Sequence, residues 1–328
     1  MRFITIAGAA VLLSLAPFAS ALADNSDADD LLRVIKRARL IDLSHTWEIT
    51  SPISSVNPPY AFELVATHDI ATLPGVTPKG PGTRGAFGDG GQLSFTAEVM
   101  HFSGQHGAPT LDAIGHIGRN GLLFGGVDAA KSTSNPDGIG ASGTGANLAV
   151  DNYPTDLLIN RGVLLDVATM IQGDSSPLPE KYEITARHLR DAAHVQGVRL
   201  RRGDTVFIRT GWGQFFKGDP VKYKGDNSPG PGVDAAQYLI DQRVKVVGND
   251  TLTFEQRPPL VFAPKFQVFP VHMMLIPDHG IYIIENLNLE ELAQKRAYEF
   301  AVVVPPLKVK GGTGSALRVF ALVPRDDD

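Results

Sequence analysis

The sequence predicts an α/β domain, and three observations carry that prediction. Residues 162–167 and 205–210 are continuously apolar runs bounded by Gly and Asp, as expected for strands of a sheet that is covered on both faces. Between them, residues 185–195 are expected to form a helix, with Thr185 as its N-cap. Strands that alternate with helices, without an internal repeat, are typical of one α/β domain.

The composition is that of an ordinary globular protein. The 328 residues are 43% hydrophobic and 20% charged, which supplies a substantial core, and their number fits one large domain or two ordinary ones. The formal net charge is -5 and no segment concentrates Lys or Arg, so we expect no nucleic acid as a partner. Because the chain has no cysteine, a bound metal must be held by His, Asp or Glu.

The first 23 residues differ in kind from the rest of the chain. Arg2 gives a positive start, residues 4–15 are nearly all apolar, and residues 21–23 form an A-x-A cleavage site. The apolar run is shorter than the about 20 residues that cross a bilayer. We therefore predict a signal peptide over residues 1–23, a folded domain over residues 24–328, and a periplasmic or secreted protein without a stable membrane anchor. The alternative is an uncleaved N-terminal anchor.

The next elements follow from patterns of apolar residues and breakers. Residues 31–39 alternate apolar and basic positions at helical spacing and lead into the apolar residues 40–45, which predicts a short helix and then a strand. Residues 50–91 are rich in Pro and Gly and predict a long loop, a kind of segment that often carries function. Alternation over residues 92–102 predicts a strand, which the polar residues 104–118 follow directly.

The rest of the chain continues the alternation of strands and helices. Residues 131–147 are rich in Gly, Ser and Asn and predict an exposed excursion that need not be a domain boundary. The further elements expected in chain order are a helix at 234–241, a strand at 244–247, a strand at 280–284, a helix at 289–294 and a strand at 298–304.

Two segments concentrate groups that can hold a metal. His106, Asp112 and His116 share one parity just beyond the predicted strand, so in an extended chain they face one side, where they suit zinc, manganese or iron. By spacing alone they equally fit a loop whose side chains hydrogen-bond to one another. Glu285 follows four apolar residues, 13 positions after His272. A carboxylate at the end of a buried strand needs a partner, either a metal or an arginine.

These segments carry a resemblance to a known family. Residues 106–116 resemble the pattern H-x-G-T-H-x-D-x-x-x-H of the cyclase superfamily of metal-dependent hydrolases, which includes kynurenine formamidase and isatin hydrolase. The segment ending in Glu285 resembles that family's H…G-I-x-x-x-E-N-L. Further matches occur in the same order, so that the resemblance covers roughly residues 40–323: these are residues 42–45, 161–166, 203–212 and 231–250.

The resemblance implies a role for each site residue. It makes His106, Asp112, His272 and Glu285 ligands of a divalent metal, zinc or manganese, and His116 the catalytic proton shuttle. Such a metal acidifies water and polarises a carbonyl, and an imidazole beside it moves the proton. The resemblance thus predicts a hydrolase.

One position departs from the family pattern. Thr110 stands where the family usually has a second His ligand, and Ala108-Pro109 replaces the preceding G-T. A hydroxyl is a weak neutral ligand, so the number of metals stays open between one and two. A proline also restricts the residue before it, which can redirect the loop.

The implied fold is the swivelling β/β/α domain of the cyclases, a single α/β domain with a mixed sheet, and we expect a homo-oligomer. The implied activity is the opening of an amide-like or lactone-like bond in a small molecule, such as a formamide, a cyclic amide or a lactone. The alternative is an exported metal-binding or ligand-binding protein of the same fold without turnover. Activity against aryl formamides, isatin and lactones distinguishes the two.

The remaining aromatic side chains give weaker hypotheses. His45 either lines the pocket or is a hydrogen-bonded structural residue, and His279 is expected in a solvated turn. Trp47, Phe87 and Trp212 either form an aromatic wall for a planar substrate or belong to the core.

Overall fold

The computed structural model describes residues 25–66, 96–134, 143–144 and 147–325, which form two compact units that meet between Ala38 and Arg39. The first unit holds helix α1 (Asn25–Arg37). This helix begins six residues before the predicted Leu31. The predicted signal peptide lies outside the described residues, and no helix among those described is long and apolar enough to cross a bilayer.

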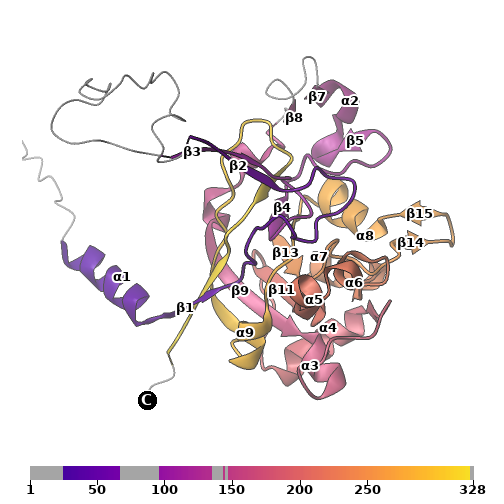
Figure 1. Cartoon of the computed structure of the whole chain (residues 1–328). Helices are drawn as coiled ribbons and strands as arrows, with labels where there is room; N and C mark the ends of the chain where they lie inside the picture. The colour runs from indigo at the N-terminus through magenta and orange to yellow at the C-terminus, as the bar shows by residue number, and fades with distance from the viewer. Residues whose placement is uncertain (1–24, 67–95, 135–142, 145–146, 326–328) are drawn as a thin grey trace, which may run out of the picture. The chain divides into compact units, whose positions relative to one another are not determined.

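The second unit is built on one nine-stranded mixed sheet (Figure 1). Four neighbouring strands are parallel, and antiparallel strands extend the sheet on both sides. In spatial order the strands are β1 (Arg39–Asp42), β19 (Phe320–Val323), β17 (Glu299–Val303), β9 (Ile159–Asp166), β11 (Thr205–Arg209), β13 (Val246–Asn249), β16 (Tyr282–Glu285), β4 (Thr110–Asp112) and β18 (Gly314–Ala316). The predicted α/β class and mixed sheet are confirmed.

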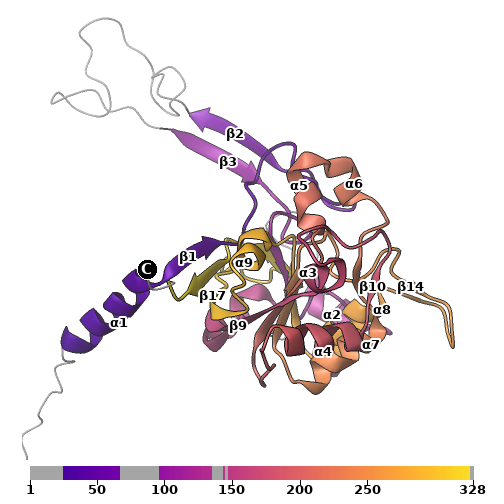
Figure 2. The same ribbon diagram turned by 90° about the horizontal axis from the view of Figure 1, so that it is seen from below.

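Both faces of the sheet are covered, as the continuously apolar strands predict. Along β9, Val163 and Leu165 face one apolar cluster, whereas Leu164 between them faces another. Among the helices that contribute to the cluster around Val163, three lie side by side on that face (Figure 2): α3 (Val167–Gln172), α4 (Ala186–Val195) and α7 (Val233–Asp241). The short helix α9 (Glu290–Gln294) contributes Leu292 to the opposite cluster.

Most predicted elements of the second half are present. The helix with Thr185 as its N-cap is α4, where the Thr185 side chain accepts from the backbone of His188 and the His188 ring accepts from the backbone of Thr185. The strand predicted at 244–247 is β13, displaced by two residues to Val246–Asn249. Three other predicted elements correspond to β16, α9 and β17 within two residues.

A two-stranded arm leaves the sheet (Figure 2). One of its strands lies within the strand predicted at residues 92–102, and the other lies where a loop was predicted. Strand β2 (Ala61–Ala66) pairs antiparallel with β3 (Ala97–His101), so part of the Pro-rich and Gly-rich stretch is regular. Apolar side chains on the arm are exposed, Met100 for example by 51%. The pairing of two distant segments corrects the sequence prediction, because each strand is short and depends on the other for its hydrogen bonds.

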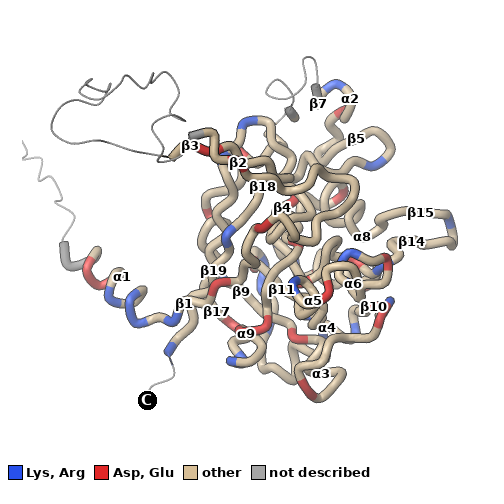
Figure 3. The backbone as a smooth tube through the Cα atoms, viewed as in Figure 1, with Lys and Arg blue, Asp and Glu red and all other residues tan. Residues whose placement is uncertain are grey.

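Short elements connect these parts. They are α2 (Ala129–Ser132), α5 (Phe215–Gly218), α6 (Pro220–Lys224), α8 (Pro270–Met273), β5 (Leu122–Leu123), β6 (Val127–Asp128), β7 (Thr133–Ser134), β8 (Gly143–Thr144), β10 (Glu183–Ile184), β12 (Gly230–Pro231), β14 (Leu260–Val261), β15 (Gln267–Val268), single 3-10 turns at Phe124–Gly126, Val150–Asn152, Thr155–Leu157 and Trp212–Gln214, and a π-type turn at Met274–Asp278. Acidic and basic residues are interspersed along the described chain (Figure 3), and the absence of a nucleic-acid partner stays a prediction.

Candidate metal centre

Two buried carboxylates face one another from neighbouring strands of the sheet. Strands β4 and β16 pair antiparallel, with Thr110 opposite Glu285 and Asp112 opposite Ile283. Side chains of directly paired residues lie on the same face, and alternate residues of one strand share a face. Thr110, Asp112 and Glu285 therefore project to one side of the sheet, and the side chains of Asp112 and Glu285 are wholly buried there.

His272 completes a compact group with these two carboxylates. It lies on α8, and its Nε2 is 3.4 Å from Glu285 Oε1 and 3.7 Å from Asp112 Oδ2. One ligand atom from each of the three residues lies within 4.8 Å of the others. Two ligands that are each about 2.1 Å from a tetrahedral ion are about 3.4 Å apart. The spacing of the three residues therefore fits one divalent cation.

The hydrogen bonding of the two carboxylates also fits a cation. Both oxygens of Asp112 and both oxygens of Glu285 are buried and have no hydrogen-bond partner among the described residues. Burial raises the pKa of each of these carboxyl groups, against the opposing effect of nearby His charges. Burial alone lowers the pKa of His272, but its hydrogen bond to Glu255 and the nearby carboxylate of Glu285 outweigh burial and raise the pKa to about 10. A cation supplies the positive charge that this group lacks.

The other two predicted site residues lie at the edge of this group. His106 Nε2 is 3.8 Å from Glu285 Oε2, and His116 Nε2 is 3.8 Å from Asp112 Oδ2. Their side chains are 14% and 21% exposed, more than the 3% of His272. Burial, and then the charges of His106 and His272, lowers the pKa of His116 to about 4. His116 is therefore neutral near pH 7.

The sequence prediction of an extended segment was wrong, although its residues do converge. Strand β4 covers only Thr110–Asp112, so Asp112 lies in a strand and not beyond one. His106 has a φ of 54°, and the backbone N–H of His116 bonds back to Ala113 in a turn. His106 and His116 thus reach the site by two bends of the chain. Thr110 is buried, and its Oγ1 accepts a hydrogen bond from the backbone N–H of Gly107 (3.2 Å).

Comparison with known proteins identifies the family. Residues 41–256 match the Cyclase family model, about two thirds of the chain. The chain belongs to the cyclase family. The family match includes His106, Asp112 and His116, whereas His272 and Glu285 lie after it.

Individual members of the cyclase family agree with this identification. The chain is 31% identical over 128 residues to an isatin hydrolase from Roseibium aggregatum, and this stretch covers 38% of the chain and 46% of that protein. The chain thus spans about half the length of the curated relative that it matches. A crystal structure described as a novel cyclase is 28% identical, with a TM-score of 0.71 over 90% of each chain.

Two isatin hydrolase structures share the fold. One, bound to the product analogue thioisatinate, is 20% identical with a TM-score of 0.66 and covers 93% of this chain and 100% of its own. The other, isatin hydrolase A from Ralstonia solanacearum, is 20% identical with a TM-score of 0.64 and covers 94% of this chain and 100% of its own. The predicted cyclase-type fold is confirmed.

Two residues of this cyclase that the sequence analysis missed contact the imidazoles. Glu255 is buried, and its Oε1 lies 2.6 Å from His272 Nδ1. Asn57 Nδ2 lies 2.7 Å from His106 Nδ1. An acidic residue directly after the apolar Phe254 was a usable sign of a buried partner, but no local sign marked Asn57, which precedes two prolines in a loop.

The segments that carry the site contain non-glycine residues in the left-handed region. Positive φ angles occur at His106 itself (54°), at Phe254 before Glu255 (47°), at Phe269 before α8 (53°) and at Asn286 after Glu285 (62°). Each costs a non-glycine residue on the order of 1 kcal/mol or more, and such costs concentrate at functional sites.

Of the three aromatic residues predicted to form a wall, Trp47 lies beside the site. The ring of Trp47 packs against the backbone of Gly107, next to His106. The contact is so close that a Cβ at Gly107 would overlap the Trp47 ring. Trp212 is buried in a small cluster with Tyr223, so it belongs to the core, and the predicted wall residue Phe87 lies outside the described residues.

The two other predicted histidines differ in environment. His45 stacks on Phe216, with ring centroids 3.9 Å apart, and burial lowers its pKa to about 4. His45 Nε2 is buried without a hydrogen-bond partner among the described residues. His279 is exposed and bonds the backbone oxygen of Met274, as expected for a solvated turn.

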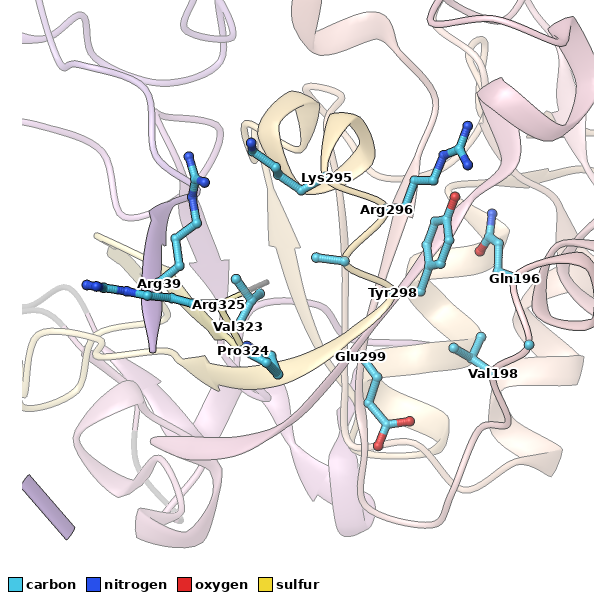
Figure 4. Close-up of a pocket in the computed structure, with 12 residues that line it drawn as sticks. Arg39, Gln196, Val198, Lys295, Arg296, Tyr298, Glu299, Val323, Pro324 and Arg325 are labelled. Atoms are coloured by element: carbon cyan, nitrogen blue, oxygen red, sulfur yellow. The ribbon is translucent and has the colours of Figure 1, made fainter. Parts of the chain in front are cut away.

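A separate surface hollow of about 860 Å³ lies near the ends of β17 and β19 and contains no residue of the metal centre (Figure 4). It is lined by Arg39, Gln196, Gly197, Val198, Lys295, Arg296, Ala297, Tyr298, Glu299, Val323, Pro324 and Arg325.

Proposed function

We propose that this cyclase is a metal-dependent hydrolase that opens an amide-like or lactone-like bond of a small molecule. One observation carries the proposal: two buried carboxylates without hydrogen bonds converge with His272 at the spacing of metal ligands. The alternative partner considered for Glu285, an arginine, is not found among the ion pairs of the described residues.

Asp112, Glu285 and His272 Nε2 hold the cation in this proposal. The donor set, with imidazole and carboxylate but no thiolate, suits zinc or manganese. When bound, such an ion supplies Lewis acidity, which makes water a usable nucleophile near pH 7 and polarises a substrate carbonyl. The sheet contributes rigidity, because Asp112 and Glu285 lie on paired strands whose backbones cannot separate without loss of ladder hydrogen bonds.

His116 is the proposed proton shuttle. With a pKa of about 4 its ring is neutral near pH 7, so it can take a proton from the attacking water. It can then deliver that proton to the leaving nitrogen or oxygen, which leaves the ring neutral for the next cycle. Among the five site residues predicted from the sequence, it has the most exposed side chain, consistent with contact with a substrate.

Substrate, location and assembly are parts of the same proposal. The named relatives that hydrolyse isatin, a cyclic amide, support a cyclic amide, a formamide or a lactone as substrate. The predicted signal peptide supports a periplasmic or secreted enzyme, and the family resemblance supports a homo-oligomer.

The test combines metal analysis with a substrate panel. The purified protein should contain zinc or manganese and should hydrolyse at least one compound from a panel of aryl formamides, isatin and lactones. Chelation should abolish that activity, and return of the metal should restore it. A protein that binds the metal but hydrolyses none of the panel would favour the binding protein without turnover.

A further inference from the structure

Two of the three imidazoles at the site, those of His272 and His106, are held by hydrogen-bond partners of opposite kind. His272 Nδ1 faces a carboxylate oxygen of Glu255 at 2.6 Å, whereas His106 Nδ1 faces the amide nitrogen of Asn57 at 2.7 Å. A neutral imidazole has one N–H and one lone pair, so the partner of one ring nitrogen decides what the other presents.

Glu255 is an acceptor, and the backbone holds it in place. Its carboxylate accepts hydrogen bonds from the backbone N–H of Val271 (3.2 Å) and of His272 (3.0 Å). His272 Nδ1 therefore donates its hydrogen to Glu255. In the neutral ring, Nε2 then carries the lone pair, and it faces Asp112 and Glu285. This is the arrangement of a metal-ligating histidine oriented by a carboxylate.

Asn57 is a donor, and a carbonyl fixes which end of its amide faces His106. Asn57 Nδ2 also lies 3.3 Å from the backbone oxygen of Gln105, which can only accept. A reversed amide would place two oxygens against each other there. Nδ2 therefore has hydrogens for both partners, and His106 Nδ1 accepts. The proton of the neutral His106 ring is then on Nε2.

We propose that His106 is not a metal ligand in this chain but presents an Nε2–H donor beside the cation, and that His272 is the single imidazole ligand among the five predicted site residues. The inference rests on the metal centre of the proposed function and departs from the ligand role that the family resemblance implies for His106. His106 also lies outside the three-residue group whose ligand atoms are mutually within 4.8 Å. A donor in this position suits a carbonyl oxygen that gains negative charge during hydrolysis.

Nitrogen-15 NMR of the histidine rings tests the assignment directly. In the metal-free full chain, His106 should show a protonated Nε2 and an unprotonated Nδ1, with assignment from the spectrum of His106→Ala. After addition of zinc the His106 signals should keep this tautomer, whereas the His272 signals should shift as Nε2 binds the ion. A His106 ring with its proton on Nδ1 overturns the proposal.

Asn57→Asp should convert His106 into a ligand. The carboxylate accepts where the amide donated, so the His106 proton moves to Nδ1 and the Nε2 lone pair turns to the cation. We expect zinc to bind about 10-fold more tightly, and pulsed EPR with copper(II) as the probe should count two imidazoles instead of one. Asn152→Asp, which makes the same charge change at an exposed position, is the matched control and should change neither quantity.

Three variants at Glu255 and His106 complete the test. Glu255→Gln should weaken zinc binding by about 10–100-fold, and Glu255→Asp should recover part of it. His106→Ala should leave zinc affinity within a small factor of the wild type. Two imidazoles in the wild-type spectrum, or a loss of affinity in His106→Ala as large as in His272→Ala, overturns the inference. A wild type that binds no metal instead refutes the proposed function, while the metal-free NMR spectrum still decides the tautomer of His106.

Discussion

The two sides of the metal centre are built by different means. Asp112 and Glu285 belong to paired strands inside the sheet and His272 to a helix packed behind it, and all three are buried. His106 and His116 belong to bends of the chain and are partly exposed. The sheet thus places the charges, which need burial and fixed spacing, whereas the bends place the groups that carry protons and meet the substrate.

The two sides of the metal centre also differ in their cost in electrostatic free energy. Two carboxylates that lie within one cation's reach repel each other, and only a framework of many ladder hydrogen bonds holds them together without the ion. A neutral imidazole has no such cost and can lie on a loop. We therefore expect changes on the sheet side to act on metal binding and changes on the bend side to act on turnover.

The largest effect is expected from Asp112→Asn on the sheet side. An amide oxygen replaces a charged ligand, so zinc affinity should fall by more than the about 100-fold that follows loss of an outer partner. The measurement is thermal unfolding with and without zinc. At 100 times the dissociation constant, zinc stabilises the wild type by about 2.7 kcal/mol, and the variant should gain almost nothing at that concentration. Equal gains in both proteins would remove Asp112 from the ligand set.

On the bend side, the variant His116→Ala tests the role of this residue in proton transfer. Turnover should fall by about 10²-fold or more, because proton transfer to the leaving group is lost, while the bound metal stays. Metal content and initial rates are measured on the same preparation. Loss of the metal in this variant would show that His116 is a ligand and that the two sides do not divide the work in this way.

The pH dependence of metal binding tests the sheet side without a substitution. The pKa of His272 is raised to about 10, so the metal-free protein holds this proton at lower pH and zinc must displace it. Binding should therefore tighten by about tenfold for each unit of pH rise below 10, or about 100-fold between pH 6 and pH 8. Isothermal titration in buffers of different ionisation enthalpy measures the proton released. An affinity independent of pH would contradict the assignment of His272 as ligand.

The smallest effect is expected from Thr110→His, which adds a nitrogen donor on the same face as Asp112. Zinc should bind about 10-fold more tightly, but the larger ring in a buried position should lower the metal-free stability by about 1–3 kcal/mol. A metal titration and a denaturant titration measure the two changes. Unchanged affinity in a folded variant would mean that position 110 has left the metal shell.

The sequence predicted the regular part of the fold well because apolar runs and a helix cap mark the buried strands and the helix there. Strand β9 contains the buried apolar run 163–165 and β11 the buried apolar run 206–208, and Thr185 caps α4 as expected. Strand β4 was missed because its three residues include two polar side chains that serve the site. Strand β2 was missed because its partner β3 lies more than 30 residues away, and pairing at that distance leaves no local pattern.

For the site, the sequence and its family resemblance named five residues that the structure brings together. Glu255 and Asn57 could not be found in the same way, because they pair with His272 and His106 across 17 and 49 positions. The motif shows which rings are present, but the proton on each ring depends on a partner that only the folded chain supplies.

The arm of β2 and β3 fixes the spacing of two residues of the metal centre. Its two ends lie at the site: Asn57 precedes β2, and His106 follows β3. The ladder that joins Ala61 to His101 closes the arm close to the site, so the distance from Asn57 to His106 does not depend on the length of chain between Ala66 and Ala97. We therefore expect changes of length between Ala66 and Ala97 to leave the geometry of the metal centre unaltered.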